Sequence, residues 1–86
     1  MNQSIQFPDQ QHWNSEDQVV EFPALNNGQL IRCQASLTWL MQQGELEEQT
    51  EASILALFEQ LRFDIEEQIE AVIEDEDIDQ DGVIRL

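Results

Sequence analysis

Between residues 52 and 76 the apolar residues recur at every third or fourth position, which is the pattern of an amphipathic helix. A helix of this length would measure about 35 Å at 1.5 Å per residue, as long as a small domain is wide. The stripe contains Ile54, Phe58, Leu61, Ile65, Ile69 and Val72, and it is widened by Leu55, Leu57 and Ile73. Such a broad stripe packs on a globular core rather than in a coiled-coil seam. The rest of the chain must therefore cover it.

Phe63 does not fit this stripe, because it falls on the opposite side of the helix among Glu59, Glu66 and Glu70. Either the helix continues and presents Phe63 to solvent, or it breaks and Asp64 caps a second helix. Neither glycine nor proline interrupts the segment. We therefore expect one continuous helix and an exposed Phe63.

The dipeptide Asn27-Gly28 is the strongest local signal, because it favours a two-residue type I′ turn between antiparallel strands. The turn fixes the register, so that Phe22 faces Cys33. Pro23 falls on a non-hydrogen-bonded pair, where its missing N–H points away from the partner strand and blunts the outer edge. One face of the hairpin then carries Val20, Phe22, Ala24, Ile31, Cys33 and Ala35, and the other carries Val19, Glu21, Pro23, Arg32 and Gln34.

Shorter elements are expected on both sides of the hairpin. Residues 2–7 suit an edge strand, residues 10–17 a polar loop, and residues 83–86 a last strand. Ser36 is placed to cap a short helix that Gly44 ends.

These elements predict a single α+β domain over residues 1–86. In it, a small antiparallel sheet, made of the 18–36 hairpin and short terminal strands, packs against the long amphipathic helix and one short helix. The expected core consists of Val20, Phe22, Ile31, Cys33, Leu37, Leu40, Ile54, Phe58, Leu61, Ile65, Ile69, Val72 and Ile84.

The chain carries 19 acidic residues against three arginines and no lysine, which gives a formal net charge of −16. This charge repels phosphate backbones and anionic lipids, so nucleic-acid and membrane-surface binding are not expected. A single cysteine excludes an internal disulfide, and the usual metal-ligand spacings are missing. With no signal-like start and no membrane-length apolar run, we expect a cytoplasmic protein.

Residues 77–82 match the start of an EF-hand calcium loop, with Asp77, Asp79 and Asp81 at the oxygen positions and then Gly82. However, Arg85 stands at the ninth position, and the chain stops before the closing glutamate. A solvated acidic turn is the preferred interpretation, with divalent binding as the alternative. No catalytic or cofactor-binding residue is predicted, since the register buries Cys33.

Several segments carry a resemblance to a known family. These are the N-terminal SIQFPD, then VVEFPALNNG with a cysteine five residues after its glycine, and LFEQLRFDIEEQIEAVIEDE. Together they resemble the small bacterial family of uncharacterised proteins called domain-of-unknown-function family 1488. The resemblance covers nearly the whole chain and implies a short α+β fold with no assigned activity. The acidic segment GELEEQTE departs from the family pattern, which leaves the start of the long helix open.

The expected function is that of a small acidic, non-enzymatic protein-binding or regulatory module. The alternative is an acidic protein that mimics nucleic acid and occupies a basic groove of its partner, since 15 of the 19 acidic residues follow position 44. The candidate interaction residues are Phe63, Pro23 and Trp39, and Phe63 with Pro23 is expected to form an apolar patch rimmed by charge. The expected state is a monomer or a weak homodimer.

Overall fold

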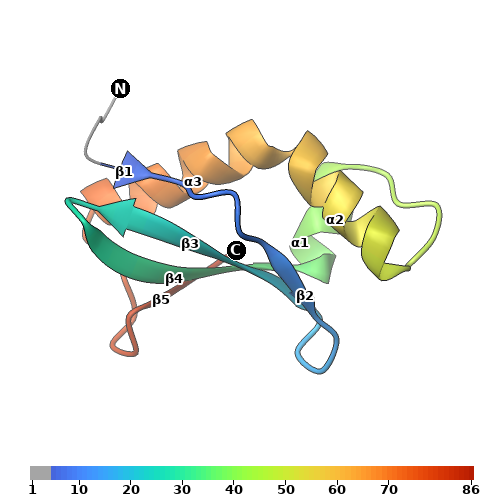
Figure 1. The fold of residues 1–86 in the computed structure, drawn as a ribbon, viewed down its shortest axis with the longest axis horizontal. Helices are drawn as coiled ribbons and strands as arrows, with labels where there is room; N and C mark the ends of the chain where they lie inside the picture. The colour runs from blue at the N-terminus through green and yellow to red at the C-terminus, as the bar shows by residue number, and fades with distance from the viewer. Residues whose placement is uncertain (1–4) are drawn as a thin grey trace.

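In the computed structural model, which describes residues 5–86, five strands form one sheet and the helices cover one of its faces (Figure 1). The strand order is β1-β3-β4-β5, and β2 also pairs with β3, so the predicted α+β class is confirmed. The pairs within β1 to β4 are antiparallel, whereas β5 runs parallel to β4. The elements are β1 (Ile5–Gln6), β2 (His12–Asn14), β3 (Val19–Asn26), β4 (Gln29–Ser36), α1 (Leu37–Gln43), α2 (Glu51–Gln60), α3 (Arg62–Glu74) and β5 (Val83–Arg85).

The hairpin between β3 and β4 has the predicted register. Asn27 and Gly28 have φ angles of 55° and 81°, as a type I′ turn requires, and Phe22 pairs with Cys33. Pro23 pairs with Arg32. Counting from the turn, this is a non-hydrogen-bonded pair, so the nitrogen of Pro23 points towards the edge occupied by β1 and β2.

The edge beside β3 is split into two strands, and two prolines explain why. Gln6 pairs with Leu25, so two residues further along the same register Pro8 would lie opposite Pro23. At that position each residue should donate its N–H to the other strand. Neither proline has an N–H, so the ladder cannot continue. The chain bulges outward over residues 7–11 and pairs again from His12, two residues out of step. The prediction of a polar loop at residues 10–17 was therefore wrong for residues 12–14, which form β2.

The prediction of one continuous helix over residues 52–76 was also wrong. α2 ends at Gln60, α3 begins at Arg62, and Leu61 between them has φ −95° and ψ 8°. Helical hydrogen bonds reach the joint from both sides, since the N–H of Leu61 donates to the carbonyl of Leu57 at 3.0 Å and the N–H of Ile65 donates to that of Leu61 at 2.9 Å. The joint is therefore a kink. It does not lie at Asp64, which is in the first turn of α3.

Side-chain caps fix where the first two helices begin. The hydroxyl of Ser36 accepts the N–H of Trp39 at 3.1 Å, and the hydroxyl of Thr50 accepts the N–H of Ser53 at 3.2 Å. Gly44 is the C-cap of α1. The acidic connection at residues 45–49 is not helical.

One hydrophobic cluster joins the inner face of the sheet to the three helices. Its members are Ile5, Val20, Phe22, Ala24, Cys33, Ala35, Leu37, Leu40, Ile54, Leu57, Phe58, Ile65, Ile69, Ile73 and Ile84. Three predicted core residues, Ile31, Leu61 and Val72, are only partly buried against it. Val19 and Val83 are buried outside the cluster. Within residues 5–86, no helix is long and apolar enough to cross a membrane.

Candidate interaction site

Phe63 is the most exposed large apolar side chain among the described residues, with 86% of its surface accessible. It is the second residue of α3, directly after the kink. Asp64 and Glu67, one and four positions further along α3, are also exposed. The site is thus an aromatic ring that projects from a helix surface rich in carboxylates.

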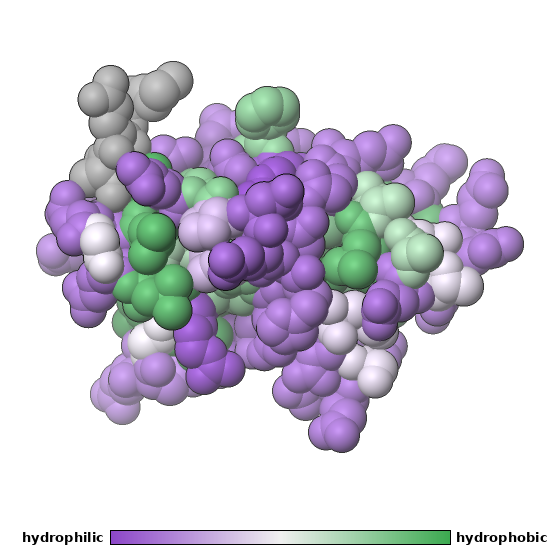
Figure 2. All heavy atoms as spheres, viewed as in Figure 1, coloured by the Kyte–Doolittle hydropathy of each residue, from purple (hydrophilic) through white to green (hydrophobic). Residues whose placement is uncertain are grey.

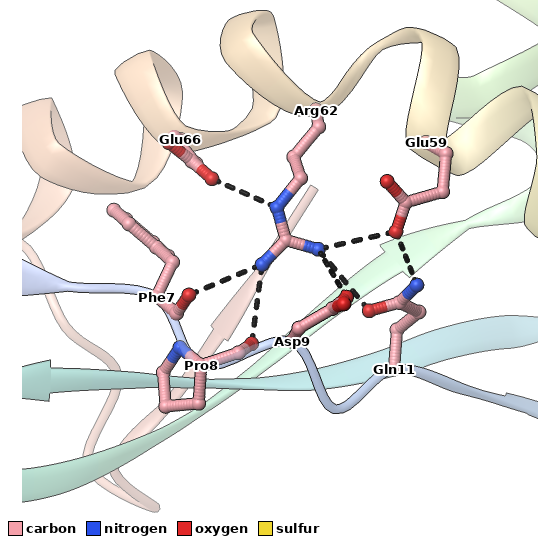
Figure 3. Close-up of polar contacts among 7 residues, drawn as sticks. All are labelled: Phe7, Pro8, Asp9, Gln11, Glu59, Arg62 and Glu66. Carbon is pink, nitrogen blue, oxygen red and sulfur yellow. Dashed lines mark hydrogen bonds and ion pairs between the residues drawn. The ribbon is translucent and has the colours of Figure 1, made fainter.

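Arg62 explains the position of this helix end. Its side chain crosses from α3 to the bulge between β1 and β2 and is only 21% exposed (Figure 3). Nη2 donates to the carbonyl oxygens of Phe7 and Pro8 at 3.2 and 3.1 Å. The carbonyl of Pro8 would face Pro23, which has no N–H, so the guanidinium supplies the donor that is missing there. The carbonyl of Phe7, which side-to-side alternation turns away from β3, is a second acceptor for the same nitrogen.

The remaining nitrogens of Arg62 complete an arrangement that we call the Arg62 clasp. Nε donates to Glu66 at 3.0 Å, and Nη1 donates to Glu59 at 3.3 Å and to the side-chain oxygen of Gln11 at 3.1 Å. The amide of Gln11 in turn donates to Glu59. One planar cation therefore ties together both sides of the kink and the edge of the sheet.

The Arg62 clasp also determines where Phe63 points. Successive residues on a helix are about 100° apart, so fixing Arg62 towards the sheet edge turns the next side chain away from it. The contacts of Arg62 with the carbonyls of residues 7 and 8 were not predicted from the sequence. Once the hairpin register is set, the alignment of Pro8 with Pro23 is the signal that indicates them.

The structure does not bring the three predicted interaction residues together. Pro23 shares its face of the hairpin with Glu21 and Arg32, and this is the face that the helices leave open. Trp39 is partly buried against the core. The expected patch of Phe63 with Pro23 is therefore not formed. In the view of Figure 2, hydrophilic residues cover most of the surface, and hydrophobic residues gather near its two ends.

A hollow of about 270 Å³ lies beside Pro23 on the open face. At its rim, one oxygen of Glu21 lies 2.8 Å from Nε2 of His12. The other oxygen lies 3.5 Å from the amide nitrogen of Gln34 and 3.8 Å from Nη2 of Arg32. Arg32 is 72% exposed, so solvent screens this pair.

The acidic turn of residues 77–82 is occupied by a guanidinium. Arg85 lies 3.2 Å from Asp79 and 2.6 Å from Asp81, and Asp81 also accepts the N–H of Val83 at 3.1 Å. The hydrogen bond from Arg85 is the main cause that lowers the pKa of the Asp81 carboxyl. Within residues 5–86, no group of three or more histidine, cysteine, aspartate or glutamate side chains is arranged to hold a metal ion.

Cys33 is buried opposite Phe22 in the inner face of the sheet, with 1% of its surface accessible. Burial raises the pKa of its thiol to about 12. The thiol therefore stays protonated at neutral pH, and a protonated thiol is a poor nucleophile.

Residues 5–86 match the family described as "Protein of unknown function (DUF1488)". The chain is 40% identical over 88 residues to the uncharacterized protein YrdB of Escherichia coli (strain K12), with 100% of this chain and 99% of that protein covered. YrdB of Shigella flexneri is 39% identical over the same length, also with 100% of this chain and 99% of that protein covered. A crystal structure of a DUF1488 family protein of unknown function from Shewanella loihica PV-4 is similar, with a TM-score of 0.90 and 38% identity. It covers 100% of this chain and 94% of that one.

Proposed function

The chain belongs to the DUF1488 family, and we propose that it is a non-enzymatic module of the bacterial cytoplasm that binds a basic protein partner through Phe63. The single observation that carries this proposal is the 86% exposure of Phe63 on a helix surface rich in carboxylates. Aromatic residues are enriched at the anchoring positions of interfaces. The protonated Cys33 thiol supports the non-enzymatic interpretation.

The Phe63 ring and the surrounding carboxylates would contribute to binding in different ways. Burying the ring of Phe63 against a partner would contribute about 1.5–3 kcal/mol. The carboxylates contribute chiefly to the association rate, because a formal net charge of −16 attracts a basic surface over a longer range than the ring can. Added salt should therefore slow association while leaving the apolar contact in place.

Affinity capture from a bacterial lysate tests the proposal with three forms of the chain. Phe63→Ser removes the ring, and Met41→Ser is the matched control, because Met41 is another exposed apolar side chain but lies on α1. We expect a basic protein that the wild type and Met41→Ser retain and Phe63→Ser loses. Equal retention by Phe63→Ser would contradict the proposal.

Mimicry of nucleic acid is the second candidate, supported by the 15 acidic residues that follow position 44. A mimic binds its partner mainly through charge. Its complex should dissociate as salt rises, and duplex DNA should compete with it. A complex held by the ring of Phe63 should form more slowly at the same salt concentration but should not dissociate.

Phe63 also supports weak self-association. The net charge opposes a homodimer, so added salt should strengthen it rather than weaken it. Sedimentation velocity at low and moderate salt should detect a dimer of the wild type and none of Phe63→Ser. A monomer in both forms at every salt concentration would leave only the heteromeric role.

A further inference from the structure

Part of the β4 edge is uncovered. β4 spans Gln29–Ser36, whereas β5 pairs only with Arg32, Cys33 and Gln34. Because Asn26 and Gln29 close the two-residue turn, Leu25 and Leu30 form a non-hydrogen-bonded pair, and the N–H and C=O of Leu30 point away from β3. In the described part of the chain, no backbone hydrogen bond outside the regular elements involves Leu30. An unpaired strand edge of this kind is a template for another chain.

A hollow of about 500 Å³ lies beside this edge, between the hairpin tip and the end of α3. Its apolar lining comes from Leu30, Ile31, Ile73 and Ile78. Leu30 is 62% exposed, unlike the other apolar residues of the hairpin. Figure 2 shows hydrophobic residues at the surface near the end of the molecule where the β3–β4 turn lies. The hollow is therefore open to a side chain from outside.

Glu76 is an exposed acidic residue in the lining of this hollow, and its backbone conformation is unfavourable for a residue other than glycine. Its φ is 55°, and its N–H donates to the carbonyl of Ile73 at 3.1 Å, while the N–H of Asp77 donates to that of Val72 at 3.0 Å. This is a Schellman motif, whose left-handed position favours glycine. Glycine would suit this position better than glutamate, so the carboxylate of Glu76 is present at a cost in backbone energy.

We propose that the uncovered edge of β4 receives an extended apolar–basic segment of a partner protein as an added strand. Its backbone pairs with the N–H and C=O of Leu30, an apolar side chain enters the hollow, and a lysine or arginine faces Glu76. A second copy of this chain fits poorly, because each copy carries a formal charge of −16 and has only three basic residues. This site is separate from Phe63 and does not rest on the function proposed for it.

Fluorescence anisotropy with a labelled, end-capped hexapeptide of alternating lysine and valine tests the proposal. The wild type should bind the peptide saturably. In an added strand only every second N–H faces β4, so methylation of the lysine nitrogens and methylation of the valine nitrogens should have different effects. Methylation of the backbone nitrogens that face β4 should abolish binding, and methylation of the others should leave binding nearly unchanged.

Glu76→Gly separates binding from stability. It removes the carboxylate and relieves the left-handed glutamate, so it should raise the urea midpoint of unfolding while weakening the peptide about fivefold. Leu30→Ser should weaken the peptide as well, and Phe63→Ser should leave it unchanged. The proposal is overturned if the wild type binds no peptide, if both methylated peptides bind alike, or if only Phe63→Ser abolishes binding. The last result would place the peptide on the helix surface and support the function proposed for Phe63.

Discussion

Removal of the Arg62 guanidinium should destabilise the protein far more than an ordinary ion pair would. Arg62→Ala leaves the carbonyls of Phe7 and Pro8 without their common donor, Nη2 of Arg62. Each unsatisfied carbonyl costs about 1–3 kcal/mol when it is buried, and less where water can reach it. Arg62 is 21% exposed, so water replaces part of the loss. The change also leaves Glu59 and Glu66 without their shared cation.

We expect a total loss of about 3 kcal/mol for Arg62→Ala and about half of that for Arg62→Lys. Lysine keeps the charge but is a compact donor that cannot reach both carbonyls and both carboxylates. Urea titration at fixed ionic strength measures the loss, because guanidinium chloride would screen the same contacts. Hydrogen exchange should localise it through weaker protection of amides in β1 and β2.

Arg32→Ala is the matched control for Arg62→Ala. Arg32 is 72% exposed and contacts Glu21 at 3.8 Å, so its removal should cost less than about 0.5 kcal/mol. The reasoning would be refuted if Arg62→Ala cost no more than this control, or if Arg62→Lys matched the wild type. Either result would mean that the bulge at residues 7–11 is held by its own packing and not by the guanidinium.

Three further predictions follow from the same contacts. Phe22→Ala should cost about 3–5 kcal/mol in a urea titration, and Val19→Ala, which is buried outside the main cluster, about 1–2 kcal/mol; equal losses would contradict the core assignment. Native Cys33 should resist iodoacetamide at pH 8 and react once the chain unfolds. Because folding raises the pKa of this thiol from 9.0 to about 12, its contribution to stability should be complete below pH 9 and decrease as pH rises towards 12. Calorimetry should detect no saturable calcium binding in the micromolar range, since Arg85 already occupies the carboxylates of Asp79 and Asp81; a one-site isotherm that Asp79→Ala abolishes would overturn this.

The hairpin was predictable because its determinants are local. Asn27 and Gly28 select one turn, the turn fixes the pairing of Phe22 with Cys33, and the alternation of side chains follows without any distant information. The exposure of Phe63 was predictable for a similar reason, since it breaks an otherwise acidic helix side. Both predictions depend only on residues that are close to each other in the sequence.

The kink at Leu61 was not predictable in this way. Its sequence surroundings favour an unbroken helix, and no glycine or proline is present. The contacts that fix the joint come from residues 7–11, about fifty positions earlier, and they exist only because Pro8 and Pro23 meet in the register of the sheet edge. The burial of Val19 was missed for a related reason, because side-chain alternation assigns a residue to a face but does not say what covers that face.

The two proposed surfaces lie at the two ends of α3, and each end is fixed by a different device. Phe63 follows Arg62, whose clasp ties the start of the helix to the sheet edge, whereas Glu76 closes the Schellman motif after its last turn. They are thirteen positions apart in the sequence, which is about 20 Å at 1.5 Å per residue. Substitutions that far apart and without shared partners act additively. A change at Phe63 should therefore leave strand addition at β4 intact, so the helix surface and the sheet edge can serve two segments of one partner or two separate partners.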